Sequence, residues 1–290
     1  MINIDLNKNE LSLLSLVPQV LRARDFRLYT GGSSKGKARK PQRLIDLWQN
    51  GGAAVLGHTP PLLLREIKNT ASRGLYAPFP HFTEQRFLKA LSQLLPDMSF
   101  RIYAHLPNEL SLQNIVLWRP YFDFCKPNKS TAGQPSKVAS DTAQQPETLL
   151  IPVLPGIQGW RNGLPFGLCV VAVPNEQAAK VFVTLPPNDF LPPVLLAAAT
   201  RGIWDLIAAA PKRANIQYQR INKILKASLW LAKGIYLFPR TKPEPETWEV
   251  LFCRFLDAGF LLPPLPEHPL ILPGILSPGE EAKLAEVLGG

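Results

Sequence analysis

The sequence has few of the side chains on which disulfide-stabilised proteins and metal sites depend. It contains three cysteines and four histidines among 290 residues. Cys125, Cys169 and Cys253 lie far apart, with no CxxC pair and no histidine at metal-ligand spacing. This pattern excludes a disulfide framework and a zinc site, and it predicts buried or half-buried thiols in a reducing compartment. We therefore expect no metal.

Catalytic signatures are also missing. The chain has no Walker loop and no GxGxxG, HExxH or GxSxG motif. His58, in the turn LGHTP, could serve as an acid or base, but we favour a hydrogen-bonding residue at the entry to a helix. His81, His105 and His268 are predicted to have structural or surface roles.

Long apolar runs are absent too. The longest candidate, residues 191–200, is interrupted by Pro192 and Pro193 and followed by Arg201, so it falls short of the ~20 residues that a membrane span needs. Asp5 and Glu10 precede the first apolar run, which is the wrong polarity for a signal peptide. We therefore expect a cytoplasmic protein without a membrane partner.

The composition that is present predicts a folded chain. It is 46% hydrophobic and 19% charged, with 30 prolines, and at roughly 150 residues per domain it predicts about two domains. The net charge is +10, and residues 22–43 concentrate it, with eight basic side chains and one acidic one. An anionic partner such as nucleic acid is the less favoured interpretation, because Phe26 and Tyr29 are the only aromatic residues there. A solvated basic connection is favoured.

Hydrophobic periodicity predicts a mixture of helices and strands. Helices are expected at residues 11–21, 62–72, 83–95, 109–121, 193–209, 214–231, 247–258 and 278–288, with Thr83 and Ser277 as N-caps. Strands are expected at residues 43–48, 100–104, 149–154, 168–173, 235–238 and 270–272. Two strands, 149–154 and 168–173, are continuously apolar, which is typical of a parallel or mixed sheet covered on both faces. Residues 126–147 contain one large aliphatic residue and no aromatic one, which predicts a flexible linker.

Residues 43–96 carry an ordered series of short motifs. A strand ends in Asp46, a glycine pair follows, and a Leu-Gly-His turn precedes a helix and a Thr-Glu pair. In order and spacing this series resembles the opening of class III aminotransferases, and the nearest type within that family is glutamate-1-semialdehyde aminomutase. The matching positions are Asp46, Gly51, Leu56, Gly57, His58, Pro61, Gly74, Thr83, Glu84 and Pro96.

The resemblance continues after the linker. Residues 162–168 resemble the Gly-Leu-Pro-x-Gly turn that follows the cofactor lysine of the family. Thr184 and Asn188 resemble a Thr-x-x-x-Asn-Pro stretch, although Asp189 stands where the family has proline. Residues 257–288 resemble the family's small domain.

The resemblance implies an α/β fold, a truncated fold type I of the transferases that depend on pyridoxal phosphate (PLP). The large domain would keep a reduced mixed sheet, and the C-terminal small domain would be α+β. It implies an N-terminal segment with a basic loop (1–42), the first part of the large domain (43–125), a flexible linker replacing deleted strands (126–147), the remaining large domain (148–232) and the small domain (233–290). The retained strands are expected in the order 100–104, 168–173, 149–154, with 149–154 as a new edge strand.

Departures from the family pattern bear on function. Counting back from the Gly-Leu-Pro turn places Gln158 at the lysine position, and an amide cannot form an imine. The carboxylate for the pyridine nitrogen would lie in the segment replaced by the linker. The phosphate-binding loop aligns with residues 104–110, where Pro107 lacks an N–H. We therefore expect no bound PLP and no catalytic residue, with Thr184 and Asn188 as vestigial cofactor-binding residues.

The resulting hypothesis is a pseudoenzyme of the aminotransferase type, which acts by binding a protein partner or a small ligand. One alternative is an active PLP-dependent aminotransferase or aminomutase that uses an unrecognised lysine, and another is a basic nucleic-acid-binding or anion-binding protein. The resemblance also implies a homodimer, or a heterodimer with an aminotransferase homologue. In the family, the stretch that contains Thr184 and Asn188 reaches into the neighbouring subunit's phosphate site.

Overall fold

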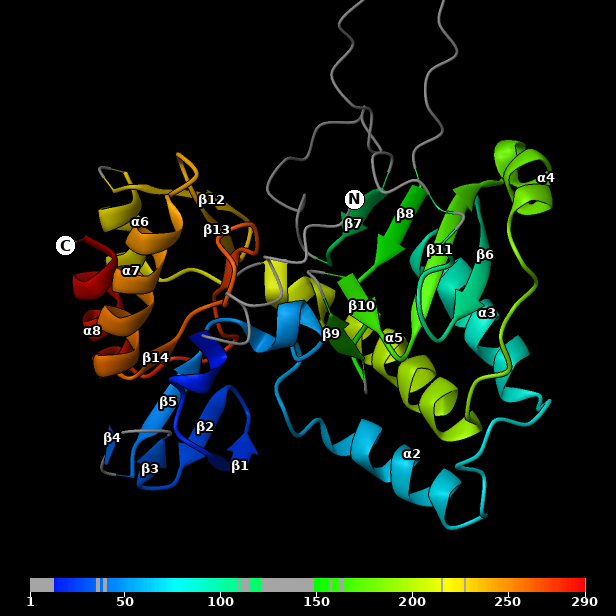
Figure 1. Cartoon of the computed structure of the whole chain (residues 1–290), viewed down its shortest axis with the longest axis horizontal. Coiled ribbons are helices and arrows are strands. Elements are labelled where there is room, and N and C mark those ends of the chain that lie inside the picture. Colours follow the sequence, from blue (N-terminus) through cyan, green and yellow to red (C-terminus); the bar gives the residue numbers. More distant parts are fainter. Residues whose placement is uncertain are drawn as a thin grey trace, which may run out of the picture.

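The computed structural model divides the chain into two lobes (Figure 1). It describes residues 13–34, 37–38, 41–108, 110, 115–120, 149–156, 158–161, 164–214, 216–226 and 228–289. The terminal lobe contains the first strands and the last helices of the described chain, and the central lobe contains the segments between them. The linker expected at residues 126–147 and Cys125 lie outside the described residues.

The terminal lobe is built on two small sheets. One has the order β1-β2-β5-β14, formed by β1 (Val20–Arg24), β2 (Arg27–Thr30), β5 (Arg43–Asp46) and β14 (Phe260–Leu261). The other has the order β12-β13-β15, formed by β12 (Trp230–Lys233), β13 (Tyr236–Pro239) and β15 (Leu270–Ile271). Helices α6 (Gln219–Leu225), α7 (Pro245–Asp257) and α8 (Pro278–Gly289) complete the lobe. Its core joins both ends of the chain, because Leu28 and Leu44 are buried in one cluster with Trp248, Phe252 and Phe260.

The expected N-terminal helix and basic connection are wrong. Only residues 13–15 are helical within the described part of the 11–21 range, and β1 begins at Val20. Pro18 removes a helical N–H at this point. The described part of residues 22–41 contains most of the antiparallel β1–β2 hairpin, closed at Asp25 with a φ of 51°, and the short pair of β3 (Ser33–Ser34) and β4 (Lys37–Ala38).

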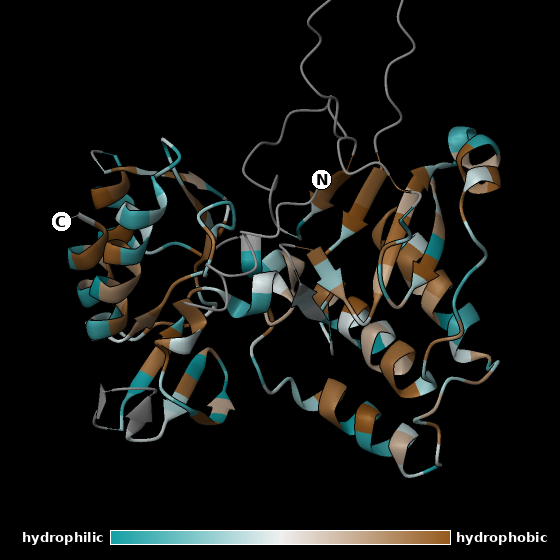
Figure 2. Ribbon diagram, in the orientation of Figure 1, coloured by the Kyte–Doolittle hydropathy of each residue, from teal (hydrophilic) through white to brown (hydrophobic). Residues whose placement is uncertain are grey.

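The sheet of the central lobe confirms the expected strand order. Its order is β6-β11-β8-β7, with β6 (Met98–Tyr103), β11 (Cys169–Pro174), β8 (Leu149–Pro152) and β7 (Ile115–Trp118). Strand β11 runs antiparallel to both β6 and β8, whereas β7 and β8 are parallel. The continuous apolar composition of β8 and β11, visible in Figure 2, suits their burial, since every residue of Cys169–Val173 is fully buried.

Strand β7 overturns two expectations. The helix expected at residues 109–121 is wrong, because Ile115–Trp118 pairs in parallel with β8. Four successive apolar residues do not by themselves distinguish a buried strand from a helix. As a result, residues 149–154 do not form an edge strand, because β8 lies between β11 and β7.

Helices pack on this sheet and on one another. Helix α5 (Pro193–Ala214) packs against α2 (Pro61–Ala71) and α3 (Thr83–Leu94), and its Leu195, Leu196, Ala199 and Ile203 are buried in the core. Among the described helices, α5 is long and apolar enough to span a membrane, but its burial here is that of a core helix. Thr83 is the first residue of α3 and not its N-cap, and its hydroxyl lies 3.1 Å from His81 Nδ1.

Two further segments differ from expectation. The helix expected at residues 214–231 is wrong, because α6 ends at Leu225 and β12 begins at Trp230. Helix α4 (Asn175–Thr184) and the hairpin of β9 (Gly159–Arg161) with β10 (Leu164–Phe166) were not anticipated. Leu164 and Pro165 of the Gly-Leu-Pro motif lie in β10, with Trp160 opposite Pro165. Between the lobes, the 3-10 segment η1 (Gln49–Gly52) contacts β9.

Candidate functional site

Gln158 lies between β8 and β9, where the carboxyl end of β8 meets the start of β11. Its side chain is 2% exposed. The amide oxygen accepts the Leu154 N–H at 3.0 Å, and the amide nitrogen donates to the Leu168 carbonyl at 2.8 Å. The side chain therefore bridges two strand ends, and both ends of the amide are hydrogen-bonded to the backbone.

Segment η1 packs against the same loop. Asn50 Nδ2 donates to the Gln158 carbonyl at 2.7 Å, and Gln49 Nε2 donates to the Ile271 carbonyl at 2.9 Å. Gly51 has a φ of 67°, and a Cβ there would lie 2.0 Å from the indole ring of Trp160. Only glycine combines this left-handed backbone with so close an approach. The Gly51 match is thus explained by packing of η1 onto β9.

Arg119, His268 and Trp160 form a polar cluster across the two lobes. Arg119 follows β7 directly, and its Nη2 donates to Nδ1 of His268 at 3.3 Å. The rings of His268 and Trp160 meet edge to face at 5.1 Å. Burial, followed by the charge of Arg119, lowers the pKa of His268 to about 4, so the imidazole is neutral near pH 7. Burial also lowers the pKa of Arg119, although a guanidinium remains charged in proteins.

Asp46 and His58 form a second polar pair. The Asp46 side chain accepts the backbone N–H groups of Trp48 at 2.9 Å and Gln49 at 2.8 Å, and its Oδ2 lies 2.8 Å from His58 Nε2. His58 N–H donates to the Asp25 carbonyl at 2.7 Å. The pair contributes to the wall of a cavity of about 360 Å³. His58 is thus hydrogen-bonded at its turn, as the favoured interpretation predicts, and it fixes the chain between η1 and α2.

Thr184 and Asn188 have structural partners. The Thr184 hydroxyl donates to the Val181 carbonyl at 2.8 Å within α4. Asn188 accepts the Ile102 N–H at 3.2 Å and donates to Glu84 at 2.9 Å. The segment of residues 186–189 therefore satisfies the outer edge of β6, an exposed row that would otherwise invite pairing with another chain.

The aligned phosphate-binding loop has no described helical N-terminus. Strand β6 ends at Tyr103, and the Pro107 carbonyl accepts the Leu110 N–H at 3.2 Å. Glu109 and residues 111–114 lie outside the described residues. The fully bonded amide of Gln158 does not fit PLP, because a Schiff base needs a free lysine amine. No cluster that could hold a metal occurs among the residues that the structure describes.

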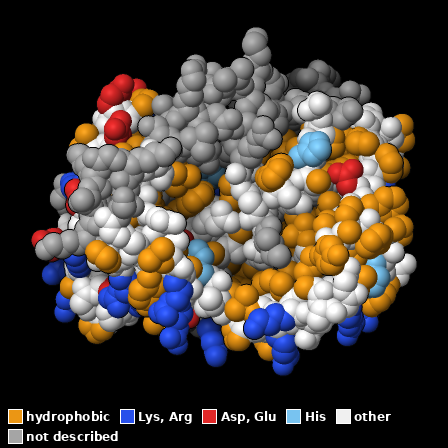
Figure 3. All heavy atoms as spheres, turned by 60° about the horizontal axis from the view of Figure 1, so that its bottom comes forward, with side chains coloured by type: hydrophobic (Ala, Val, Ile, Leu, Met, Phe, Trp, Pro, Cys, Tyr) orange, Lys and Arg blue, Asp and Glu red, His pale blue; other side chains and the backbone are white. Residues whose placement is uncertain are grey.

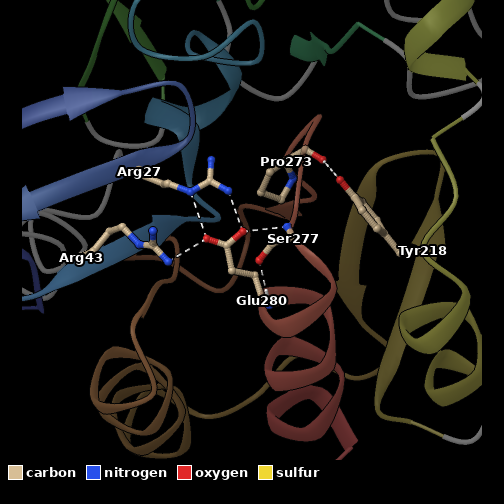
Figure 4. A network of polar contacts seen from close by, with 6 residues as sticks. All are labelled: Arg27, Arg43, Tyr218, Pro273, Ser277 and Glu280. Atoms are coloured by element: carbon tan, nitrogen blue, oxygen red, sulfur yellow. Dashed lines mark hydrogen bonds and ion pairs between the residues drawn. The ribbon is translucent and has the colours of Figure 1, made fainter.

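Two arginines of the basic segment pair with a carboxylate of the same chain (Figure 4). Glu280, in the first turn of α8, receives Arg27 Nε at 3.0 Å and Nη2 at 2.6 Å, and Arg43 Nη2 lies at 3.1 Å. Ser277 and Glu280 exchange hydrogen bonds as a capping box, which confirms Ser277 as the N-cap. Burial alone would raise the pKa of Glu280, but hydrogen bonds from Arg27 and Ser277 outweigh it and lower the pKa to about 2. Arg27 and Arg43 therefore stabilise the terminal lobe.

Comparison with known proteins places these features in a familiar fold. No family model matches the chain. A Treponema pallidum protein of unknown function is 28% identical over 282 residues, covering 88% of this chain and 89% of that one. A Borreliella burgdorferi protein is 38% identical over 79 residues, about a quarter of either chain (27% and 26%).

Solved structures of aminotransferases are similar over nearly the whole chain. Ornithine δ-aminotransferase of Plasmodium falciparum matches with a TM-score of 0.58 at 13% identity, covering 94% of this chain and 92% of that one. An ω-transaminase of Sphaerobacter thermophilus matches at 0.56 and 10% identity, covering 98% and 95%. Serine palmitoyltransferase of S. paucimobilis, described with a bound PLP–myriocin aldimine, matches at 0.62 and 10% identity, covering 99% and 96%. The chain therefore has the α/β fold of PLP-dependent aminotransferases, as the opening motifs indicate.

Proposed function

We propose that this protein is an aminotransferase-fold pseudoenzyme that binds a small ligand or a protein partner without Schiff-base chemistry. One observation carries the proposal: Gln158, at the lysine position, is buried and its amide is bonded at both ends to backbone groups. A lysine amine placed there could not satisfy the Leu154 N–H, because an ammonium group has no acceptor. The glutamate-1-semialdehyde aminomutase type, suggested by residues 43–96, is part of this proposal.

Incubation with PLP tests the proposal. We expect no new absorbance band from an imine, and no lysine that borohydride reduction labels stoichiometrically. Peptide mapping after reduction checks the second point. A single lysine labelled in proportion to the protein would refute the proposal and favour the active-enzyme alternative. The alternative in which the basic segment of residues 22–43 binds nucleic acid or another anion is weakened by the pairing of Arg27 and Arg43 with Glu280.

We further propose that the partner binds the apolar face of the central lobe, as a second copy or an aminotransferase homologue in the cytoplasm. Figure 3 shows a broad hydrophobic surface on this lobe. In the loops of this lobe between α2 and α3 and before α5, Tyr76 is 71% exposed, Phe79 52% and Phe190 63%. The Val194 N–H donates to the Leu75 carbonyl at 3.0 Å, which brings the loops that carry these aromatic residues together. Exposed apolar patches of this kind mark interaction sites.

Analytical ultracentrifugation tests the self-association arm of this proposal. At micromolar concentration we expect twice the single-chain mass of 32.2 kDa, and Phe79→Glu should shift the protein toward one chain. Val250→Glu, at a 68% exposed position on α7, is the matched control and should leave the mass unchanged. A single-chain mass for the unaltered protein, alone and mixed with a homologue, would contradict the proposal.

A further inference from the structure

The carboxyl ends of β7 and β8 meet where an α/β sheet commonly binds ligands. The two strands are parallel, and the Val153 N–H donates to the Trp118 carbonyl at 2.9 Å just beyond them. Figure 1 shows these ends directed toward the terminal lobe. Ligands of open α/β sheets bind outside the carboxyl ends of the strands. Arg119 follows one of these ends, and Gln158 and Trp160 follow the other.

Among the residues that the structure describes at this edge, Arg119 is a cation without a carboxylate partner. Within the described part of the chain its hydrogen-bond partner is His268, whose imidazole is neutral, and its Nε–H is buried without an acceptor. No described carboxylate pairs with it, in contrast to Arg27 and Glu280. A guanidinium withdrawn from water is costly unless an anion compensates its charge. The position therefore calls for an external anion.

Trp160 supplies a second donor beside the same histidine. Its indole Nε1–H is buried and has no hydrogen-bond partner. The ring of Trp160 contacts the ring of His268, and His268 is hydrogen-bonded to Arg119. The side chains that carry the two unsatisfied donors therefore both contact the same imidazole. Arg119 and Trp160 are partly exposed as whole residues, whereas Nε of Arg119 and Nε1 of Trp160 are buried, so an acceptor must enter between the side chains to reach these donors. Native buried donors without partners are rare and call for an explanation.

We propose that Arg119 and Trp160 bind the carboxylate of a small organic acid, with His268 holding the guanidinium in place. A carboxylate carries one negative charge and two oxygens, which match one guanidinium and two unsatisfied N–H donors. A phosphate group, with a higher charge and more oxygens, needs more donors than this edge provides. The inference deepens the proposed function, on which it rests, by naming the ligand class for a site that works without an imine.

The indole N–H signals of the protein labelled with ¹⁵N-tryptophan test the proposal. The chain has six tryptophans, and the signal missing in Trp160→Phe identifies Trp160. We expect sodium acetate to shift this signal to saturation, whereas sodium chloride at equal ionic strength leaves it in place. Arg119→Gln should abolish the shift, and Arg65→Gln, at an exposed position on α2, should preserve it.

The outcomes separate this proposal from the proposed function. If Arg119→Gln does not fold, Arg119→Lys keeps the charge but removes Nε–H, and it should weaken acetate binding roughly tenfold or more. Equal shifts with chloride, a shift that survives both Arg119 substitutions, or a shift with inorganic phosphate but not acetate would overturn the carboxylate assignment. Formation of an imine with PLP would refute the proposed function and leave the acetate result standing.

Discussion

Replacing Gln158 tests whether this position is structural or free for chemistry. Gln158→Met keeps the length of the side chain but removes both hydrogen bonds, leaving the Leu154 N–H and the Leu168 carbonyl unpaired in a buried place. Each unsatisfied group costs about 1–3 kcal/mol, so for the two groups we expect a loss of about 2–6 kcal/mol in the free energy of unfolding. That is a large part of the ~5–15 kcal/mol that stabilises a typical domain.

Urea unfolding followed by circular dichroism and tryptophan fluorescence measures this loss. Gln85→Met, at an exposed position on α3, is the matched control and should change the free energy of unfolding by less than ~0.5 kcal/mol. Gln158→Lys should lose at least as much as Gln158→Met near pH 7, because it also buries an ammonium group. It should not capture PLP, since a lysine alone restores neither a phosphate-binding loop nor a ring carboxylate. Equal stability of Gln158→Met and the unaltered protein would refute the structural role of the amide.

Three further predictions test the surrounding structure. Glu280→Gln should cost about 2–3 kcal/mol at pH 7, because the folded pKa of about 2 lies below the ordinary value of 4.5. Urea unfolding at several pH values should show this stability in full above pH 4.5 and lost as the pH falls toward 2, and a difference independent of pH would contradict the Arg27 pairing. Gly202→Ala places a Cβ 2.4 Å from the Pro155 carbonyl oxygen, so we expect the variant to be about 1–3 kcal/mol less stable and to melt at a lower temperature. An unchanged melting temperature would show that α5 can shift to make room. Asn188→Ala should lower stability by about 1–3 kcal/mol in urea unfolding without altering the response to PLP, and an altered PLP spectrum would instead restore its cofactor role.

The order of three strands in the central sheet was implied by the family resemblance, whereas two of these strands, β8 and β11, were located from their continuous apolar runs. Strands β8 and β11 are covered on both faces, and such strands leave a strong local signal. Strand β7 could not be separated from a helix, since Ile115–Trp118 is a short apolar run whose partner, β8, lies across the linker. The β1–β2 hairpin was missed for a similar reason, because the burial of Leu28 depends on strands and helices from the other end of the chain.

The candidate site, too, could be predicted from the sequence only in part. Gln158 could be located from its distance to the Gly-Leu-Pro turn, and the structure shows which backbone groups its amide bonds. No sequence pattern indicates the cluster of Arg119, His268 and Trp160, because these residues are far apart in the chain. They lie directly after β7, in the loop before β15 and in β9, respectively.

Strand β7 covers the side of β8 that was expected to be an exposed sheet edge. An exposed apolar strand at residues 149–154 would have needed a partner chain to avoid aggregation. Because β7 pairs with β8 along four residue pairs, from Ile115–Leu149 to Trp118–Pro152, that side of β8 is covered by the same chain. The same pairing carries Arg119 to the carboxyl edge beside β8, where the Gln158 amide bonds backbone groups of two strand ends. One strand thus covers the side of β8 and places a cation at its carboxyl end, which is where we propose a ligand site that works without an imine.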